Sequence, residues 1–450
     1  MKILLLGSGG REHALALKLT SSGNISNDPY PNKKVELYSA PGSDAISECG
    51  VCLRFGAEDR ESIIKWVSEN HPDLVVIGPE APLVNGMADE FTRLGVPVFG
   101  HPAATSRLEG SKSFAKDFML RHGVPCAYSR TITDANEGES VINEWKHGFP
   151  IVLKADGLAA GKGVVLAQTK SEALETLRVF LAGRFGDASL TVVLEEPLFG
   201  MELSLHVIVD VNTEHASFCI LPACQDHKRI FENDLGPNTG GMGAFGPIPF
   251  LRREDVNRLQ SDLVEPTVTG LQKDGLEGRG VLFLGVMWTQ EGPKLLEYNV
   301  RFGDPETQVL MQLLDEDLPE LLYSAATHTL KKREVKVMPG TAICVVLAAQ
   351  GYPESPEKGA TIEIRSPTCS IIHAGTAKSP NGWIVNGGRA INLVTRAKNL
   401  EEARNLIVSD LNQIGWQGMQ VRRDIGLRAL NHAKENKTVA NPWSANSNSI

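Results

Sequence analysis

Glycine-rich segments with charged neighbours are the parts of this sequence best suited to chemistry. Gly7–Ala14 follows an apolar run and precedes a helical pattern, so Gly9 and Gly10 would let a phosphate approach the backbone N–H groups of a helix N-terminus. The dinucleotide pattern G-x-G-x-x-G fails here, because Glu12 occupies the third glycine position. The segment therefore suits a phosphate of something other than a nicotinamide cofactor, or simply a tight turn. An NAD-dependent dehydrogenase is excluded.

A second glycine-rich segment, Lys154–Gly163, lies between two apolar strand patterns. A Walker A loop would need Ser or Thr after its lysine and a helix beyond it, whereas Gly163 follows Lys162 and a strand pattern comes next. We interpret the segment as a hairpin flap whose two lysines can close over a polyphosphate. The alternative is an ordinary loop, in which so many glycines would cost conformational entropy on ordering.

A carboxylate, an amide and a guanidinium follow one another at the end of a predicted strand. If strand geometry persists, alternation puts Glu297, Asn299 and Arg301 on one side. Such a set suits Mg²⁺ together with phosphate, although a solvated strand edge would look the same. The acidic turn Gly303–Glu306 comes directly after them and favours a functional role.

The charged cluster Gln225–Arg229 precedes a third glycine-rich segment, Gly236–Gly243. Basic side chains beside such a loop can bind an anionic substrate, and a solvated loop is the competing interpretation. Neither His13 nor His227 has a Ser or Cys partner at a recognised nucleophile motif, so covalent catalysis has little support.

Composition excludes several classes of protein. The chain has 450 residues, and 45 Lys+Arg against 54 Asp+Glu give a net charge of −9, which argues against general binding to nucleic acid or to a membrane surface. No apolar run approaches the roughly 18 residues of a membrane span. Seven scattered cysteines indicate reduced thiols and a cytoplasmic protein. The lone C-x-x-C of Cys49 and Cys52 lacks the further ligands that a zinc site needs.

The order of predicted elements indicates a multidomain protein of α/β and α+β class. Strand and helix patterns alternate over residues 1–104, which predicts a small doubly wound parallel sheet. Residues 105–334 carry the flap hairpin Lys154–Gly163 and the strand that ends with Glu297 and Asn299. Short strands and one helix over 335–430 predict a small α+β domain. Residues 431–450 form a polar tail.

Six segments together resemble the glycinamide ribonucleotide synthetases, a family of the ATP-grasp superfamily. The resemblance runs from Lys2 to about Leu430, with every segment in the family order. The segments are Gly9–Ala14, Gly78–Leu83, Lys154–Gly163, Gln225–Arg229, Gly236–Gly243 and Arg301–Gln308.

The resemblance implies fold, reaction and partners. It makes 105–334 an ATP-grasp domain with a flap subdomain at about 125–195, and 1–104 a substrate-binding domain. It implies that ATP, glycine and 5-phosphoribosylamine give glycinamide ribonucleotide, ADP and phosphate through a glycyl phosphate, a step of purine biosynthesis that uses Mg²⁺ or Mn²⁺. No enzyme nucleophile is required. We expect a monomer that binds neither nucleic acid nor membrane, with a transient contact to the enzyme supplying phosphoribosylamine.

The family's site residues carry over position by position. The positions matching ATP contacts are Lys112, Lys154, Gly157, Gly161, Lys162, Gly163, Glu195, Glu196, Leu198 and Glu202. Those expected to face the other substrates are Gly9, Gly10, Arg11, Glu12, Pro79, Glu80, Asn238, Thr239, Gly240, Gly241 and Arg301. Glu297 and Asn299 match metal ligands. The expected catalytic residues are Arg301, Lys154, Asp226 and Lys228.

The sequence also departs from the ATP-grasp pattern. Many such enzymes carry a second metal-binding acid on the preceding strand, but Val281–Trp288 has none. Ser26–Lys34 resembles a polar insertion, which we expect to be neutral. Two alternatives remain: a biotin-carboxylase-like ATP-grasp enzyme, and a catalytically silent nucleotide sensor. The second would have lost a lysine or a metal ligand, and all of these are present.

Overall fold

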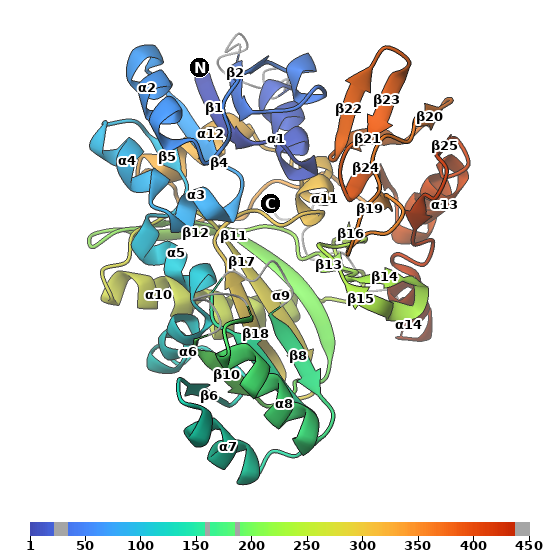
Figure 1. The fold of residues 1–450 in the computed structure, drawn as a ribbon. Coiled ribbons are helices and arrows are strands. Elements are labelled where there is room, and N and C mark those ends of the chain that lie inside the picture. The colour runs from blue at the N-terminus through green and yellow to red at the C-terminus, as the bar shows by residue number, and fades with distance from the viewer. Residues whose placement is uncertain (22–34, 158–162, 185–189, 437–450) are drawn as a thin grey trace, which may run out of the picture.

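The structure is a computed structural model that describes residues 1–21, 35–157, 163–184 and 190–436. The predicted insertion Ser26–Lys34, the flap residues Gly161 and Lys162, and the last residues of the predicted tail lie outside these ranges. The N-terminal part and the C-terminal part lie side by side above a central sheet, and a smaller lobe projects below (Figure 1).

The N-terminal part confirms the predicted doubly wound sheet. Its five strands are all parallel, in the order β3-β2-β1-β4-β5. The four residues from Ile3 to Leu6 on the central strand are fully buried, as expected for a sheet with helices on both faces. The elements are β1 (Lys2–Gly7), α1 (Gly10–Ser21), β2 (Glu36–Pro41), η2 (Ile46–Glu48), β3 (Val51–Cys52), α2 (Arg60–Asn70), β4 (Leu74–Ile77), α3 (Glu80–Val84), α4 (Met87–Arg93) and β5 (Val98–Phe99).

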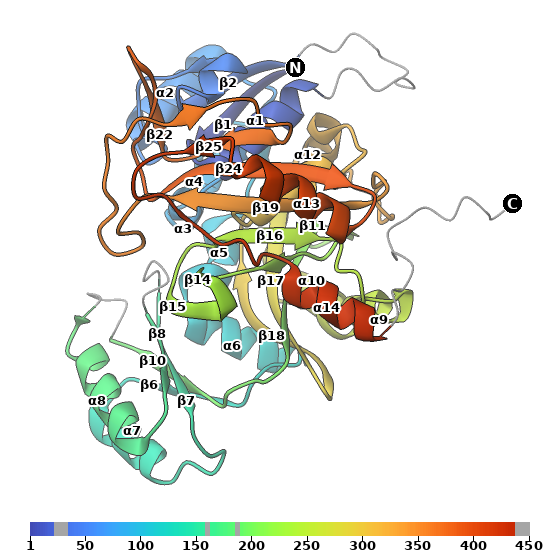
Figure 2. The ribbon, with the colours of Figure 1, turned by 90° about the vertical axis from the view of Figure 1, so that its right-hand side faces the viewer.

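The lower lobe, here the flap subdomain, is a four-stranded antiparallel sheet with two helices on one face (Figure 2). Its strand order is β6-β10-β7-β8, and Lys154 pairs with Val164 in the predicted flap hairpin. The elements leading to it are α5 (Ala103–Gly110) and α6 (Lys112–Arg121). The subdomain consists of β6 (Ser129–Ile132), α7 (Ala135–Asn143), β7 (Ile151–Ala155), β8 (Val164–Ala167), α8 (Lys170–Leu181) and β10 (Val192–Glu195).

The central sheet has the order β12-β11-β17-β18, with antiparallel pairing throughout. It confirms the predicted strand that ends at Asn299 and the preceding strand over Val281–Trp288. Its strands are β11 (Met201–Val211), β12 (Ala216–Ile220), β17 (Gly278–Thr289) and β18 (Gly292–Asn299). The helices associated with this part are α9 (Arg253–Leu259), the π-helical turn η4 (Gln260–Val264), α10 (Glu265–Lys273), α11 (Glu306–Leu313) and α12 (Leu318–Ala326).

The C-terminal sheet takes two strands from the middle of the chain. Its order is β13-β16-β19-β24-β21, with β26 paired to β19. Its later elements are β19 (Thr341–Ala348), β20 (Glu363–Ile364), β21 (Ser370–His373), β22 (Thr376–Ser379), β23 (Gly382–Val385), β24 (Arg389–Ala397), α13 (Leu400–Asp410), β25 (Ile414–Gly415), β26 (Gln420–Val421) and α14 (Leu427–Asn436).

One local expectation was wrong, and the predicted polar tail begins inside a helix. The segment Gly236–Gly246, expected to be a loop, contains parts of two strands, because β16 (Gly243–Gly246) finds its hydrogen-bonding partner in β19, far along the chain. The other elements there are β13 (Gln225–Asp226), β14 (Arg229–Phe231), η3 (Glu232–Asp234) and β15 (Leu235–Asn238). The polar tail expected from Asn431 is helical as far as Asn436, where α14 packs the ring of His432 at 5.0 Å from that of Phe250.

A buried histidine joins the N-terminal part to the central sheet. His101 is fully buried, and its Nε2–H donates to the carbonyl oxygen of Val281 at 2.9 Å. Burial lowers the pKa of His101 to about 4, and the nearby charge of Arg279 adds to the effect. The ring therefore stays neutral in the folded protein at pH values where the unfolded chain binds a proton.

This difference predicts a pH-dependent contribution to stability. Because the unfolded ring protonates near pH 6.5 and the folded ring near 4, the contribution is full above 6.5 and is lost as the pH falls. In urea unfolding, the wild type should lose up to about 1.4 kcal/mol per pH unit relative to His101→Gln below pH 6.5. Parallel pH profiles for the two proteins between pH 7 and 5 would contradict it.

Candidate active site

Glu12 folds back under the first glycine loop. The backbone N–H of Gly9 donates to Glu12 Oε2 at 2.7 Å, and Arg11 Nε donates to Glu12 Oε1 at 2.6 Å. The side chain of Glu12 is buried, so the residue that breaks the dinucleotide pattern holds the loop from inside. A direct contact between Glu12 and a substrate stays a prediction.

The glycines around Glu12 are required by its position. A Cβ on Gly7 would lie 2.5 Å from Glu12 Cγ, and one on Gly78 would collide with Glu12 Oε1 and lie 2.8 Å from the carbonyl oxygen of Leu6. Gly10 packs instead against Asn392 and Gln308, where a Cβ would lie 2.6 and 2.9 Å from the amide nitrogens. The first glycine loop therefore packs against the residue that follows β4, Gly78, and against Asn392 of the C-terminal part.

Arg301 stands between two carboxylates of the N-terminal half. Its Nε lies 3.3 Å from Glu80 Oε2, and its Nη2 lies 3.2 Å from Glu109 Oε1. Burial opposes the charge of Arg301, but Glu109 and Glu80 raise its pKa. Next to it, the carbonyl oxygen of Phe302 accepts from Arg11 Nη1 at 3.0 Å. Two predicted substrate segments therefore meet the predicted catalytic arginine.

Glu109 was missed by the sequence analysis. Its Oε2 accepts from the backbone N–H of Val300 at 2.7 Å, so it holds the strand end that carries Arg301. Burial raises the pKa of Glu109 despite the charge of Arg301. The sequence offered one signal for Glu109: it stands three residues before Lys112, which was expected to contact ATP.

A buried ion-pair network involves Glu195, the first residue of Glu195–Leu198, a segment that the family resemblance implies is a hinge whose backbone holds adenine. Glu195 forms ion pairs with Lys154 Nζ at 2.8 Å and with Lys116 Nζ at 3.1 Å, and its side chain is 3% exposed. Burial disfavours the charge of Lys154, but Glu195 and Glu297 raise its pKa. The side chain of Glu195 thus orients a predicted phosphate-contacting lysine, while Glu196 turns away to accept from Tyr128 N at 3.0 Å.

Lys112 reaches the start of the flap. Its Nζ donates to the carbonyl oxygen of Gly157 at 2.8 Å. Burial lowers the pKa of Lys112, and the neighbouring charge of Lys154 adds to this effect. The two lysines that the resemblance assigns to phosphate therefore lie near each other, at the point where the flap begins.

Glu297 is a single carboxylate among four cations. Burial opposes its ionisation, but the charges of Lys228, Lys154, Lys112 and Arg301 lower the pKa of Glu297. Cations gathered at one place can bind further anions such as phosphate. The cations come from four different segments, none of which is adjacent to another in the sequence.

Glu297 and Asn299 fit a magnesium ion that is held mainly by phosphate oxygens. They alternate on one face of β18, opposite Gly285 and Phe283 of β17. A Cβ on Gly285 would lie 3.2 Å from Glu297 Cγ, so the preceding strand has a glycine where a second acid would crowd the site. In the described residues no group of three His, Cys, Asp or Glu side chains could hold a metal. Mg²⁺ commonly takes one or two protein oxygens and completes its shell with phosphate and water.

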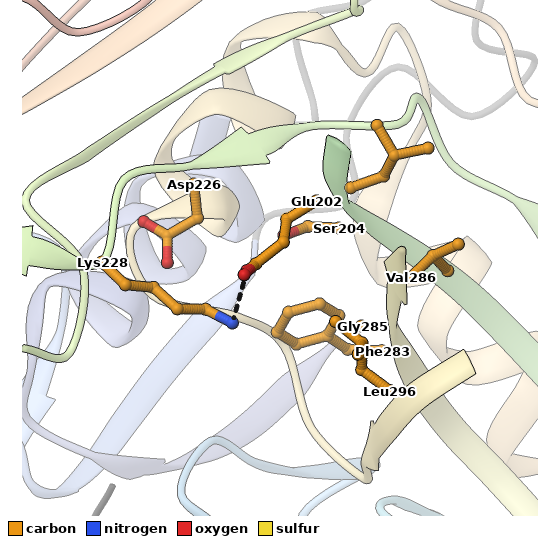
Figure 3. A pocket seen from close by; sticks show the side chains of 9 residues that line it. Glu202, Ser204, Asp226, Lys228, Phe283, Gly285, Val286 and Leu296 are labelled. Atoms are coloured by element: carbon orange, nitrogen blue, oxygen red, sulfur yellow. Dashed lines mark ion pairs between the residues drawn. The ribbon is translucent and has the colours of Figure 1, made fainter. Parts of the chain in front are cut away.

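Lys228 and Asp226 line a pocket beside the central sheet (Figure 3). Lys228 Nζ lies 3.1 Å from Glu202 Oε2, and the pKa of Lys228 is raised because Glu202, Glu297 and Asp226 outweigh its burial. Burial raises the pKa of Asp226 well above its usual range, and the charge of Glu306 adds to this. The pocket is lined by Glu202, Leu203, Ser204, Asp226, Lys228, Phe283, Gly285, Val286 and Leu296.

Arg389 of the C-terminal part is a second residue that the sequence analysis missed. Its Nη1 donates to the carbonyl oxygens of Gly240 at 2.5 Å and Asp304 at 2.7 Å, and its Nη2 lies 2.9 Å from Asp304 Oδ2. Arg389 therefore links the segment Gly236–Gly243 to the turn Gly303–Glu306. The signal was the triplet Gly387-Gly388-Arg389, which repeats the Gly-Gly-Arg of residues 9–11.

The remaining predicted residues fall into three groups. Thr239 and Gly241 lie in the same region, with a Cβ on Gly241 placed 2.8 Å from Asp226 Oδ1. Pro79 precedes α3 and Leu198 follows β10, and Gly163 pairs back to Ala155 at the flap. Gly161 and Lys162 lie outside the described residues. Their roles, like those of every residue above, stay predictions.

These features together define an ATP-grasp enzyme: a flap hairpin, the hinge segment Glu195–Leu198, and lysines near the strand that carries Glu297 and Asn299. Models of the three domains of phosphoribosylglycinamide synthetase match this chain: the N domain at residues 1–109, the ATP-grasp domain at 110–307 and the C domain at 342–428. The chain therefore belongs to the phosphoribosylglycinamide synthetase family.

Relatives agree over nearly the full length. The chain is 42% identical over 433 residues to phosphoribosylamine–glycine ligase of Rhizobium meliloti, covering 96% of this chain and 99% of the relative. A crystal structure of phosphoribosylamine–glycine ligase from Thermotoga maritima is 33% identical, with a TM-score of 0.81, and covers 94% of this chain and 100% of that one. The biotin carboxylase domain of a Hydrogenobacter thermophilus 2-oxoglutarate carboxylase, 16% identical with a TM-score of 0.71 over 96% of this chain and 93% of that one, shares the fold.

The packing of Glu12 against Gly78 gives a prediction for stability. Gly78→Ala should lower the free energy of unfolding by about 2 kcal/mol, because the added methyl group overpacks a site walled by backbone and a buried carboxylate. Gly56→Ala is the matched control, since a Cβ at Gly56 meets nothing within 4 Å, and its effect should stay within about 0.5 kcal/mol. Urea unfolding measures both; equal stabilities would refute the packing argument.

Proposed function

We propose that this chain joins glycine to 5-phosphoribosylamine with ATP, giving glycinamide ribonucleotide, ADP and phosphate. The family is that of an ATP-dependent ligase of purine biosynthesis. The observation that carries the proposal is the group of four cations, Lys112, Lys154, Lys228 and Arg301, around Glu297. Phosphoryl transfer needs little covalent help from a protein and depends instead on positioning and charge neutralisation.

In the first step, a glycine carboxylate oxygen attacks the γ-phosphorus of ATP and ADP leaves. The product is a glycyl phosphate. Lys112 and Lys154 would hold phosphate oxygens at the flap, and Arg301 would neutralise charge on the transferred group. In the second step, the amine nitrogen of phosphoribosylamine attacks the carbonyl carbon, loses a proton and releases phosphate. No nucleophile of the enzyme takes part.

The hinge and the acid–amide strand complete the ATP site. The backbone of Glu195–Leu198 would contact adenine and Glu202 the ribose, with Lys228 holding the Glu202 carboxylate at 3.1 Å. Glu297 and Asn299 would hold Mg²⁺ or Mn²⁺, which supplies charge neutralisation on the phosphate oxygens when bound. The surrounding cations keep Glu297 ionised despite its burial, so it can bind a metal without first losing a proton.

Phosphoribosylamine and glycine are assigned to segments outside the ATP site. Gly9–Glu12 and Pro79–Glu80 would face phosphoribosylamine, and Asp226, Lys228 and Asn238–Gly241 would line the glycine and acceptor sites. No described helix is long and apolar enough to cross a membrane. We propose a cytoplasmic monomer with only a transient contact to the enzyme that supplies phosphoribosylamine.

Glu297→Gln should lose at least about 100-fold in turnover while the protein stays folded, because a metal ligand is removed and the surrounding cations lose their compensating charge. ADP release is measured with ATP, Mg²⁺ and glycine, with phosphoribosylamine generated in place from ribose 5-phosphate and ammonia. Glu291→Gln is the control, since Glu291 lies exposed at the turn of the same strand pair. Near-normal turnover of Glu297→Gln at saturating Mg²⁺ would defeat the metal assignment.

The same assay tests the activity itself. Release of ADP that needs both glycine and phosphoribosylamine, with glycinamide ribonucleotide detected, supports the ligase. Release that depends on bicarbonate instead would favour the biotin-carboxylase-like alternative, and ATP binding without release would favour a silent nucleotide sensor.

A further inference from the structure

The hairpin of β14 and β15 presents two predicted substrate segments. Lys228 precedes it and Thr239–Gly241 follow it, and the backbone N–H and Oγ1 of Thr239 donate to the carbonyl oxygen of Lys228 at 2.7 and 2.8 Å. The two segments are therefore held together at the base of the hairpin. Whatever fixes the hairpin in space also fixes Lys228.

The hairpin has little apolar surface with which to fix itself. Phe231 is 54% exposed and Leu235 is 62% exposed, while Ile230 is buried. Two-stranded hairpins without a buried face are only marginally stable in water. Contacts from elsewhere must hold this one in place.

Arg422, near the end of the C-terminal part, makes such contacts. Its side chain is 0% exposed. Its Nη1 donates to the carbonyl oxygen of Arg229 at 3.0 Å and to Asp234 Oδ1 at 2.9 Å. Its Nε and Nη2 donate to the two carboxylate oxygens of Asp424 at 2.8 and 2.7 Å. A guanidinium is buried so fully only where charged partners compensate for lost hydration.

The segment around Arg422 holds both ends of the hairpin. At the tip, the backbone N–H of Asn233 donates to Asp424 Oδ2 at 2.9 Å. Asn233 and Asp234 have φ values of +59° and +55°, a left-handed conformation that needs such support even in residue types that tolerate it. At the base, the backbone N–H of Gly426 donates to His227 Nε2 at 3.3 Å. In Figures 1 and 2 the hairpin lies beside the segment leading into α14.

We propose that Arg422 is a positioning residue for the reaction. It clamps the 229–238 hairpin to residues 422–426, and so sets Lys228 opposite Glu202 and places Thr239–Gly241 at the pocket. The kinetic part of this inference rests on the proposed function. The clamp itself is a property of the folded chain.

Loss of the clamp should raise the KM for glycine more than the KM for ATP. The adenine hinge Glu195–Leu198 does not belong to the hairpin. Lys228 does pair with Glu202, which is assigned to the ATP ribose, so the KM for ATP should rise as well, but by less than about 3-fold. Glycine is assigned to the Lys228 and Thr239–Gly241 side, so its KM should rise about 10-fold or more, since small displacements of positioning groups have large effects. A purely structural role would lower stability and leave this KM ratio unchanged.

Two variants and one control test the proposal in the full chain. Arg422→Met removes the clamp, and Asp234→Asn removes the negative charge of its anchor at the hairpin tip. Arg396→Met is the control: Arg396 belongs to the same part of the chain and donates to the carbonyl oxygen of Pro339 at 2.6 Å, away from the hairpin. Hydrogen–deuterium exchange over residues 228–242 and steady-state KM values for glycine and ATP are measured for each protein.

The expected result is faster exchange over 228–242 and a selectively raised KM for glycine in both variants, with neither change in Arg396→Met. The double variant should be no worse than the more affected single variant, because both break one clamp. Unchanged exchange in Arg422→Met, or equal changes in both KM values, would overturn the proposal.

Should Arg422→Met fail to fold, Asp234→Asn decides by the same two measurements. Failure of the proposed function is distinct: the wild type would then release no ADP in response to glycine, while exchange still reports the clamp.

Discussion

The repulsion among four buried or half-buried cations is the constraint on which the rest of this structure depends. Lys112, Lys154, Lys228 and Arg301 all act on Glu297. Each unit charge taken out of water costs several kcal/mol unless an opposite charge is near. One carboxylate cannot compensate four cations, so the protein has to supply others around the rim of the cleft.

Those compensating carboxylates come from three elements, α5, β10 and β11. Glu195 pairs with Lys154, Glu202 pairs with Lys228, and Glu109 lies beside Arg301. Each pair fixes the side chain of a cation before any substrate arrives. Preorganised charges of this kind need little rearrangement when an anion binds, which is the main way a protein can assist phosphoryl transfer.

The N-terminal and C-terminal parts supply the backbone around this charged centre. Arg11 reaches the carbonyl oxygen of Phe302, and Arg389 reaches those of Gly240 and Asp304. Both arginines follow a Gly-Gly pair, and both hold the loop after Arg301 from opposite sides. The backbone around the charged centre is therefore held by contacts from three parts of the chain, although most of the ionisable residues come from the central one.

The sequence by itself determined the types of the elements, the parallel N-terminal sheet and the short segments that carry charge. These features are local: periodicity reports strands and helices, and glycines beside Lys154 or Glu12 report loops where backbone must approach another group. The family resemblance of six such segments supplied the expected roles. Glu297 with Lys112, Lys154 and Arg301 could be assigned together in this way.

Only the tertiary structure decided which charges compensate which. Arg11 meets the carbonyl of a residue 291 positions away, and Arg389 meets one 85 positions away, so no spacing in the sequence could reveal either contact. For the same reason the sequence patterns singled out neither Glu109 nor Arg422, and β16 was expected to be part of a loop because its hydrogen-bonding partner, β19, lies far along the chain. Ion pairs and strand pairing depend on distance in space, and a single sequence records only distance along the chain.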